Sequence, residues 1–258
     1  MNLLTKNQSY SLLITRPIET APLLAKEIEN LSLNFKPIIF PAIQINETTD
    51  KQNTPLIFEQ LSKHYYQLII FISPLAVEIF AKHAQQHHFS LSPQILLFCV
   101  GKDSASAIRQ KLSAKAVFPE KNYNSEALLN LKELQEVAGK KILICQGKGG
   151  NPNIHQTLIQ RGAAVDPFIL YERTLPKPEL LPDLTDIDLI ICTSQESLVN
   201  LMKLFKEPIK NKLFLFSSEK LKALGEQLGL KYPPILVKHA GNEAILEALR
   251  GIHLKKRI

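Results

Sequence analysis

Residues that can bind carboxylates recur in this sequence directly after short apolar runs. Thr15 and Arg16 follow the run Leu12–Ile14, and Ser73 follows Gln67–Ile72. Similar positions further along the chain hold Ser104, Gly147 with Lys148 and Gly149, Ser194 and Ser218. Hydroxyls, cations and free backbone N–H groups at such turns can hydrogen-bond an anion. The competing interpretations are a plain helix cap for each serine and a solvated charge for Arg16 and Lys148.

A glycine-rich turn, Gly147–Gly150, holds three of the ten glycines of the chain. It follows the apolar run Lys141–Cys145 and precedes a helical pattern that begins at Asn151-Pro152, a capping residue followed by a residue with a fixed φ. A dinucleotide fingerprint needs G-x-G-x-x-G and a P-loop needs Gly-Lys-Ser/Thr, and this turn has neither. A generic anion site and a plain tight turn remain as interpretations.

The composition indicates a cytoplasmic globular protein with an acidic partner, for which a small polyanionic ligand is one candidate. Of its 258 residues 45% are hydrophobic and 21% charged, with a net charge of +7. Lysines are spread along the chain rather than clustered with aromatic residues, so nucleic acid is not the expected partner. We expect no membrane span, because no apolar stretch approaches about 20 residues, and no export signal is expected at the amino terminus.

Histidine and cysteine positions do not indicate a metal site. His83 and His87 are four residues apart on an expected helix, but no carboxylate or thiol pattern accompanies them. A solvated helix end is the preferred interpretation of this pair, and a metal site is the alternative. Cys99, Cys145 and Cys192 each lie late in an apolar run, which is typical of small buried hydrophobic residues and gives neither zinc spacing nor a disulfide framework.

Apolar strand-like runs alternate with helical patterns along the chain, which predicts an α/β fold. Ala42–Pro55 is expected to be irregular, Ala116–Phe118 to be a short strand, and Ser125 to cap one helix that extends through Leu134. The pattern also repeats. The segment from Leu68 resembles that from Leu189, and the segment from Leu12 matches that from Ile142.

This repeat predicts two similar Rossmann-like or flavodoxin-like lobes, each a parallel sheet with helices on both faces. Residues 1–41 with 174–258 would form a discontinuous α/β lobe, and residues 42–173 a central α/β lobe. The chain would cross between the lobes near Pro41–Ile45 and near Tyr171–Pro176. Since ligands bind beyond the carboxyl ends of parallel strands, the cleft between the two lobes is the expected site.

The ordered set of motifs resembles the uroporphyrinogen-III synthase family. The residues that carry this resemblance are Thr15-Arg16-Pro17, Ser73-Pro74, Ala76-Val77, Val100-Gly101, Ser104-Ala105, Ser125–Leu129, Ala138–Leu143, Gly147–Gly150, Arg161–Ala163, Tyr171–Arg173, Thr193-Ser194 and Ser218–Leu221. They are spread over nearly the whole chain, and the order rather than any single motif is specific. Gln146 and Asn151-Pro152 depart from the family pattern, which has arginines on both sides of the turn.

The resemblance implies two α/β lobes joined by a two-stranded linker, in an enzyme that acts without metal or organic cofactor. Its reaction would close hydroxymethylbilane, a linear tetrapyrrole with eight carboxylates, to uroporphyrinogen III with inversion of ring D. Tyr171 matches the recurring tyrosine of the family and is the candidate general acid, expected to face the cleft. The alternative for Tyr171 is a hinge residue whose hydroxyl finds a backbone partner. A monomer that receives its substrate from the preceding bilane-forming enzyme is expected.

Two other functions remain as alternatives. One is a two-lobed cytoplasmic ligand-binding or sensor protein without catalysis, which the absence of a visible catalytic dyad would suit. The other is a two-lobed sugar-nucleotide transferase, although the sequence has no evident nucleotide motif. A fold alone cannot distinguish these functions.

Overall fold

The computed structural model describes residues 9–31, 33–48, 53–177 and 181–254. The chain divides into two compact units, one of residues 1–44 with 174–258 and the other of residues 45–173. We call them the discontinuous unit and the central unit, and each is described by itself. The chain passes from one unit to the other at Gln44/Ile45 and at Arg173/Thr174.

The discontinuous unit is built on a five-stranded parallel sheet. In sheet order its strands are β10 (Ile235–Leu236), β9 (Leu213–Phe216), β8 (Leu189–Cys192), β1 (Tyr10–Ile14) and β2 (Phe35–Ile39). β8 and β9 are continuous apolar runs, as expected for strands that are covered on both faces.

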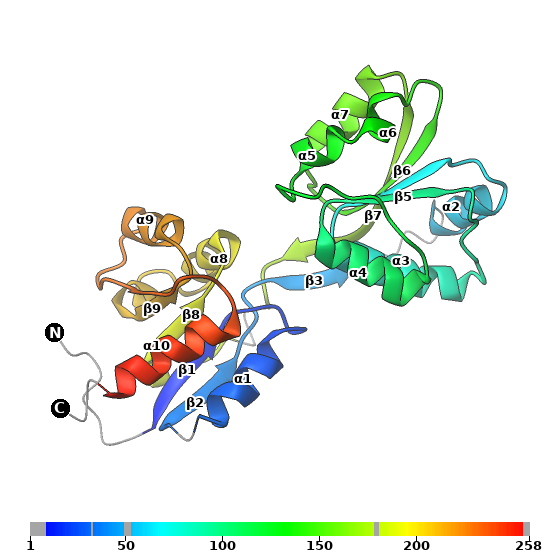
Figure 1. Cartoon of the computed structure of the whole chain (residues 1–258). Helices are drawn as coiled ribbons and strands as arrows, with labels where there is room; N and C mark the ends of the chain where they lie inside the picture. The colour runs from blue at the N-terminus through cyan, green and yellow to red at the C-terminus, as the bar shows by residue number, and fades with distance from the viewer. Residues whose placement is uncertain (1–8, 32, 49–52, 178–180, 255–258) are drawn as a thin grey trace. The chain divides into compact units, whose positions relative to one another are not determined.

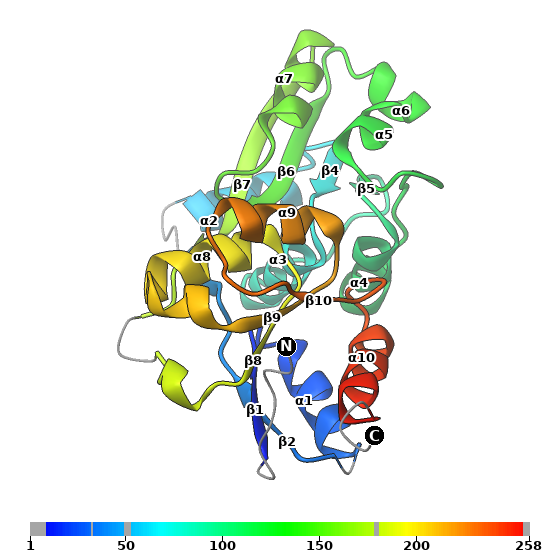
Figure 2. The same ribbon diagram turned by 90° about the vertical axis from the view of Figure 1, so that its left-hand side faces the viewer.

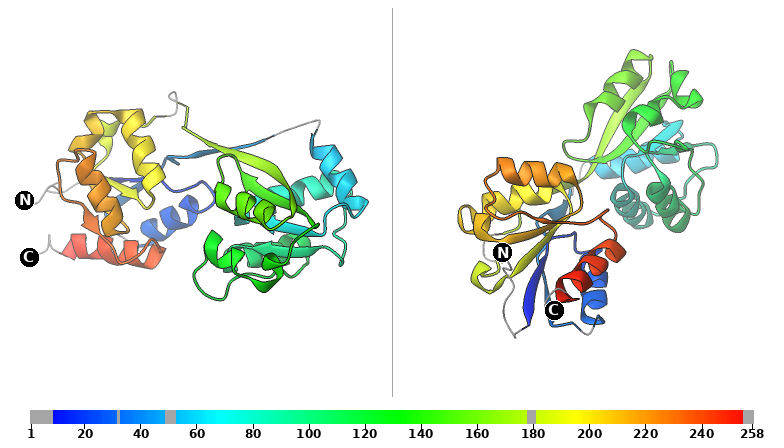
Figure 3. Two further views of the ribbon diagram at one scale, coloured as in Figure 1. Left: turned by 90° about the horizontal axis from the view of Figure 1, so that it is seen from above. Right: turned by 60° about the vertical axis from the view of Figure 1, so that its left-hand side comes forward.

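Helices cover both faces of this sheet (Figure 1). Side chains of α1 (Ala21–Glu29) and α10 (Asn242–Leu254) pack on one face, and Figure 3 shows these two helices side by side. Side chains of α8 (Gln195–Phe205) and α9 (Glu219–Gln227) pack on the other face, together with the 3-10 helices η2 (Leu184–Asp186) and η3 (Pro208–Asn211).

The central unit has a second five-stranded sheet. Its order is β3 (Gln44–Glu47), β7 (Ala164–Thr174), β6 (Lys141–Gly147), β4 (Leu68–Phe71) and β5 (Leu96–Cys99), and the four strands from β7 to β5 are parallel. β3 and β7 are neighbours in this sheet, and each contains one of the two chain crossings. They form the two-stranded linker.

Two groups of helices cover the central sheet. One face packs α2 (Asn53–Ser62), α3 (Pro74–Gln86) and α4 (Lys102–Leu112), and the other packs α5 (Ser125–Leu129), α6 (Lys132–Gln135) and α7 (Pro152–Gln160). Figure 2 shows α5, α6 and α7 at the top of the view and α3 and α4 lower down. Both units thus have the predicted α/β architecture, with parallel strands between two helical layers.

Three local expectations were wrong. Ala42–Pro55 is not irregular, because it contains β3 and the start of α2, whose Thr54, Ile57 and Leu61 are buried at helical spacing; residues 49–52 lie outside the described part of the chain. Instead of a strand, Ala116–Phe118 makes one bridge, between Val117 and Phe98.

The helix expected from Ser125 is also different. Asn124, not Ser125, is its N-cap and accepts the Ala127 N–H at 2.8 Å. The helix ends at Leu129, and α6 begins separately at Lys132. The apolar spacing carried no signal for this break, because leucines continue through both short helices.

Candidate active site

The carboxyl ends of β4 and β6 bring together three of the predicted site residues of the central unit. Ser73 begins α3 as its N-cap and accepts the Ala76 N–H at 3.1 Å. The same hydroxyl oxygen lies 3.0 Å from the Tyr171 hydroxyl. Gly147 pairs with Tyr171 across β6 and β7, at a register shift that follows Gln146.

Gly147 is needed for this arrangement because the tyrosine ring lies directly against its backbone. A Cβ at residue 147 would lie 2.5 Å from Tyr171 Cε2 and 2.7 Å from Cζ, closer than real atoms approach. The Lys148 N–H also donates to the Tyr171 carbonyl at 2.8 Å. The glycine-rich turn therefore fixes the ring and the backbone of Tyr171 together.

Tyr171, the candidate acid, is only 3% exposed and belongs to the α2–α4 core. Its apolar ring gains from this burial, and its hydroxyl has a partner in Ser73 rather than in the backbone. Ser73 is half-buried, so it is the more exposed residue of the pair.

Arg173 lies beside the Tyr171 ring, and the Lys148 side chain pairs with Glu172. The Arg173 guanidinium carbon lies 5.5 Å from the centroid of the Tyr171 ring. Lys148 is exposed and its ammonium lies 2.9 Å from Glu172 Oε1, so the solvated-charge interpretation of Lys148 describes it well. The next glycine, Gly149, has φ +75° and turns the chain toward α7, whose N-cap is Asn151 as predicted.

Ser104 does not lie at a strand-end turn. Gly101 is the N-cap of α4, and Ser104 lies inside the first helical turn, where it is buried. Ser104 has a side chain that can cap a helix, but Gly101 is also a suitable N-cap and comes three residues earlier. The helix starts at this earlier residue.

Hydroxyl groups at the carboxyl edge of the discontinuous unit have local partners. Ser194 caps α8 by accepting the Ser197 N–H at 3.1 Å and also bonds the Ser197 hydroxyl at 2.7 Å. Ser218 caps α9 by accepting the Leu221 N–H at 3.3 Å. Thr15 is buried and donates to the Ile191 carbonyl at 2.9 Å. The capping interpretation thus holds for Ser73, Ser194 and Ser218.

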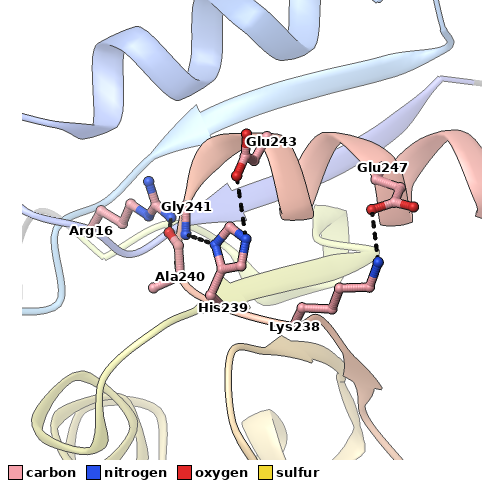
Figure 4. Close-up of polar contacts among 7 residues, drawn as sticks. All are labelled: Arg16, Lys238, His239, Ala240, Gly241, Glu243 and Glu247. Carbon is pink, nitrogen blue, oxygen red and sulfur yellow. Dashed lines mark hydrogen bonds and ion pairs between the residues drawn. The ribbon is translucent and has the colours of Figure 1, made fainter.

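Arg16 is not a solvated charge, because it is only 9% exposed and connects β1 with the start of α10 (Figure 4). Its guanidinium donates to Asn242 Oδ1 at 2.5 Å and to the Ala240 carbonyl. Asn242 in turn donates to Glu27 Oε2 at 2.6 Å. Burial lowers the pKa of Arg16, and the nearby Glu27 carboxylate partly opposes this shift.

The loop that Arg16 holds was not among the residues expected at the site. His239 Nδ1 accepts the Gly241 N–H at 3.1 Å, and His239 Nε2 lies 3.4 Å from Glu243 Oε1 (Figure 4). Lys238 lies 3.9 Å from Glu247 on the same helix. The loop follows the carboxyl end of β10, so its position after a strand was the available signal.

A family model decides the identity of the chain. The model described as uroporphyrinogen-III synthase HemD matches residues 23–233. The chain belongs to this family. It is 28% identical over 253 residues to the uroporphyrinogen-III synthase of Escherichia coli K12, covering 93% of this chain and 100% of that protein. It is also 28% identical to the Salmonella typhimurium LT2 enzyme over 254 residues, with the same coverage of both chains.

Solved structures of uroporphyrinogen-III synthases share the fold. The structure of a mutant from Thermus thermophilus has a TM-score of 0.63 at 14% identity, covering 96% of this chain and 100% of that chain. The Helicobacter pylori structure has a TM-score of 0.57 at 15% identity, covering 94% and 99%. The two-lobed α/β fold is therefore that of the uroporphyrinogen-III synthases.

Residues that could hold a metal or act as a thiol nucleophile have structural roles instead. His83 is 8% exposed, so a solvated helix end was wrong for it, and His87 stacks on Phe58 with ring centroids 5.0 Å apart. Within the described ranges no three histidine, cysteine or acidic residues gather as metal ligands. Burial raises the pKa of the Cys99 thiol to about 11 and that of Cys192 to about 12, which leaves them as unreactive thiols.

The helices of both units are short, and α3 and α10 have 13 residues each. Among the described residues, no helix is both long enough and apolar enough to cross a membrane.

Proposed function

We propose that this chain is a uroporphyrinogen-III synthase, which converts hydroxymethylbilane to uroporphyrinogen III and water. Family membership supports the reaction, and the net charge of +7 suits a substrate with eight carboxylates. The observation that carries the mechanism is the 3.0 Å contact between Ser73 and Tyr171 at the carboxyl edge of the central sheet.

Tyr171 and Ser73 act together as the acid. The Tyr171 hydroxyl is buried, so it passes its proton to Ser73 Oγ while Ser73 gives its own proton to the leaving hydroxyl of ring A. The Ala76 N–H holds Ser73 Oγ in place during this transfer. Water leaves, and an azafulvenium cation remains on the bilane.

Ring D then attacks this cation through its substituted carbon and gives a spiro intermediate. The intermediate fragments and recloses with ring D inverted, and loss of one proton returns the proton that the acid supplied. Because the free bilane closes to the type I isomer without help, the main task of the protein is to hold the bilane in one conformation.

Carboxylates of the bilane are bound, in this proposal, at the helix starts that follow the strands. Ser194, Ser218 and Thr15 provide the edge of the discontinuous unit, and Ser104 with the turn Gly147-Lys148-Gly149 provides that of the central unit. Support comes from the N-termini of α3, α4, α8 and α9, all of which follow strand ends, because the positive end of a helix dipole favours an anion there. Arg16 stabilises the edge of the discontinuous unit by donating hydrogen bonds to Ala240 and Asn242.

Placement of the bilane between the two lobes stays a prediction. We further propose that the enzyme works in the cytoplasm as a monomer and takes the unstable bilane from the enzyme that forms it. The basic composition and a substrate that closes by itself support this hand-over.

Product isomer analysis tests the proposal. Hydroxymethylbilane is generated in situ, the protein is added, the products are oxidised, and the uroporphyrin isomers are separated. Wild type is expected to give type III. Tyr171→Phe should lower the rate about 100-fold, the contribution typical of a general acid.

Tyr66→Phe is the matched control. Tyr66 is equally buried, but it precedes β4 and its hydroxyl bonds Asp166 at 2.9 Å and Gln60 at 3.0 Å. It should lose stability and keep its rate. If folded wild-type protein gives only the type I isomer, the proposal of synthase activity is wrong. If Tyr171→Phe turns over at the wild-type rate, only the assignment of Tyr171 to the acid is wrong.

A further inference from the structure

A pocket of about 290 Å³ lies beyond the carboxyl ends of β4 and β5 in the central unit. Its walls come from the ends of these strands, from the starts of α3 and α4, and from the segment before α5. The lining residues are Ile72, Pro74, Val100, Gly101, Lys102, Asp103, Ser104 and Tyr123. Neither the glycine-rich turn nor the buried Tyr171 is part of this lining.

One side of the pocket suits a flat apolar ring. Ile72, Pro74 and Val100 supply aliphatic surface, and the Tyr123 ring supplies an aromatic wall. Tyr123 is 46% exposed, so neighbouring side chains leave its ring partly uncovered. Gly101 lets this wall approach, since a Cβ there would lie 3.0 Å from Tyr123 Cβ.

Opposite charges stand side by side in the pocket. Lys102 and Asp103 are consecutive residues of the first turn of α4, and both are exposed. The Lys102 ammonium lies 5.7 Å from the centroid of the Tyr123 ring. A ligand that fits must therefore offer an anionic group to Lys102 and a hydrogen-bond donor to Asp103, next to an aromatic face.

We propose that this pocket binds one pyrrole ring of the substrate, an inference that rests on the proposed function. The ring stacks on Tyr123, its N–H donates to the Asp103 carboxylate, and one of its carboxylate side chains pairs with Lys102. The volume suits one pyrrole with its two acidic side chains and is too small for a tetrapyrrole.

This pocket also places the bound ring near the acid. Pro74, in the pocket wall, directly follows Ser73, whose hydroxyl contacts Tyr171. A ring held against Pro74 therefore lies one residue along the chain from the proton donor. The pocket thus helps to select which end of the bilane is presented for loss of water.

Substitutions in the pocket should change substrate affinity and product isomer together. Tyr123→Leu and Lys102→Met are each expected to raise KM about tenfold, the effect of one aromatic or charged contact, and to lower the type III fraction. Tyr123→Phe keeps the ring and should raise KM less than Tyr123→Leu does. Lys111→Met, at the other end of α4, is the control for a lost surface charge.

Direct binding separates this inference from the proposed function. A monopyrrole with one acetate and one propionate is added to wild type at millimolar concentration, and amide resonances are followed by NMR. Shifts at Gly101–Ser104 and Tyr123 that are lost in Tyr123→Leu are expected, whichever isomer the enzyme makes. Absence of these shifts, or an unchanged KM and isomer ratio in both pocket variants, overturns the pocket even if wild type yields type III.

Discussion

The two units use the same helix start for different purposes. Residues 68–85 align without gaps to residues 189–206, so that Ser73 corresponds to Ser194. Each serine follows an apolar strand, caps a helix and accepts an N–H from three residues later at 3.1 Å. The cap itself is therefore a shared part of the repeated unit.

The difference lies in the residue that donates this N–H. In α8 it is Ser197, whose hydroxyl bonds Ser194 at 2.7 Å, so that Ser194 has a local partner. In α3 it is Ala76, which has no hydroxyl, and Ser73 bonds Tyr171 instead. Tyr171 has no counterpart either, because residues 12–41 align without gaps to 142–171 and Pro41 stands in its place.

The shared elements form a scaffold, and the proposed chemistry is assigned to a pair that is not repeated. Strand, cap and helix recur in both units because each parallel strand needs a helix to cover it and each helix needs its first N–H groups satisfied. The Ser73–Tyr171 pair occurs in the central unit alone among the described residues of the two aligned segments. It needs three residues that the repeat does not require, namely Ala76, Gly147 and Tyr171.

Gly147→Ala should have the largest effect, because it disrupts the contact between Tyr171 and Ser73. The new methyl group would lie 2.5 Å from the Tyr171 ring, which must then move away from Ser73. We expect a loss of about 3 kcal/mol in the free energy of unfolding, from overpacking, and a rate about 100-fold lower. Urea unfolding and isomer analysis measure both.

Gly149→Ala is the control for Gly147→Ala. Gly149 has φ +75° and open space around its Cβ position, so alanine there costs about 1–2 kcal/mol of backbone strain and should leave the Tyr171 ring in place. Equal rates in the two variants would contradict the role given to Gly147.

Most of the scaffold was predictable from the sequence, and the site was predictable only in part. Buried parallel strands are continuous apolar runs, and Ser73, Ser194 and Ser218 stand at helix starts with a clear cap pattern. β3 was missed because it is a short, half-exposed edge strand with the sequence QINE, which has no buried residue.

Residue types at a turn did not indicate where their side chains go. Arg16 and Lys148 are both cations after an apolar run, but Arg16 is buried against α10 and Lys148 is 65% exposed. The partners of Arg16 lie 224 and 226 residues away in the chain, and no local pattern reports such contacts. The same holds for Tyr171 and Ser73, 98 residues apart.

Arg16→Met should have the second-largest effect on the free energy of unfolding. It leaves the Ala240 carbonyl and the Asn242 side chain without their donor, at a cost of about 2 kcal/mol in the free energy of unfolding. Lys148→Met removes only an exposed ion pair with Glu172, worth about 0.5 kcal/mol. Urea unfolding of both variants checks the difference, and equal losses would show that Arg16 does not hold the α10 loop.

Ser73→Ala and Ser194→Ala test the comparison directly. Each removes one helix cap, so each should lower the free energy of unfolding by about 1 kcal/mol. At saturating bilane only Ser73→Ala should lower the rate, about 100-fold, because it removes the group that gives its proton to the leaving hydroxyl. Similar rates for the two variants would remove Ser73 from the proton path.

Ala76→Ser tests the same comparison from the other side, because it gives α3 the serine that α8 has at residue 197. The new hydroxyl should bond Ser73 as Ser197 bonds Ser194, and draw it away from Tyr171. The expected rate lies between those of wild type and Ser73→Ala. The reciprocal variant Ser197→Ala should keep the wild-type rate.

His83→Leu gives the smallest expected change, and it is seen only in the pH dependence. The aligned residue in α8 is Leu204. Burial lowers the pKa of the His83 imidazole. The hydrogen bond with Gln86 and the Glu47 carboxylate oppose this shift, whereas the nearby charges of His87 and Lys82 add to it. Below a pH of about 6.5, the unfolded chain therefore takes up a proton that the folded chain does not, and the free energy of unfolding falls as the pH falls. Urea unfolding at pH 7.5 and 5.5 should show a smaller fall for His83→Leu than for wild type, whereas an equal fall in both would mean that His83 is protonated in the folded state.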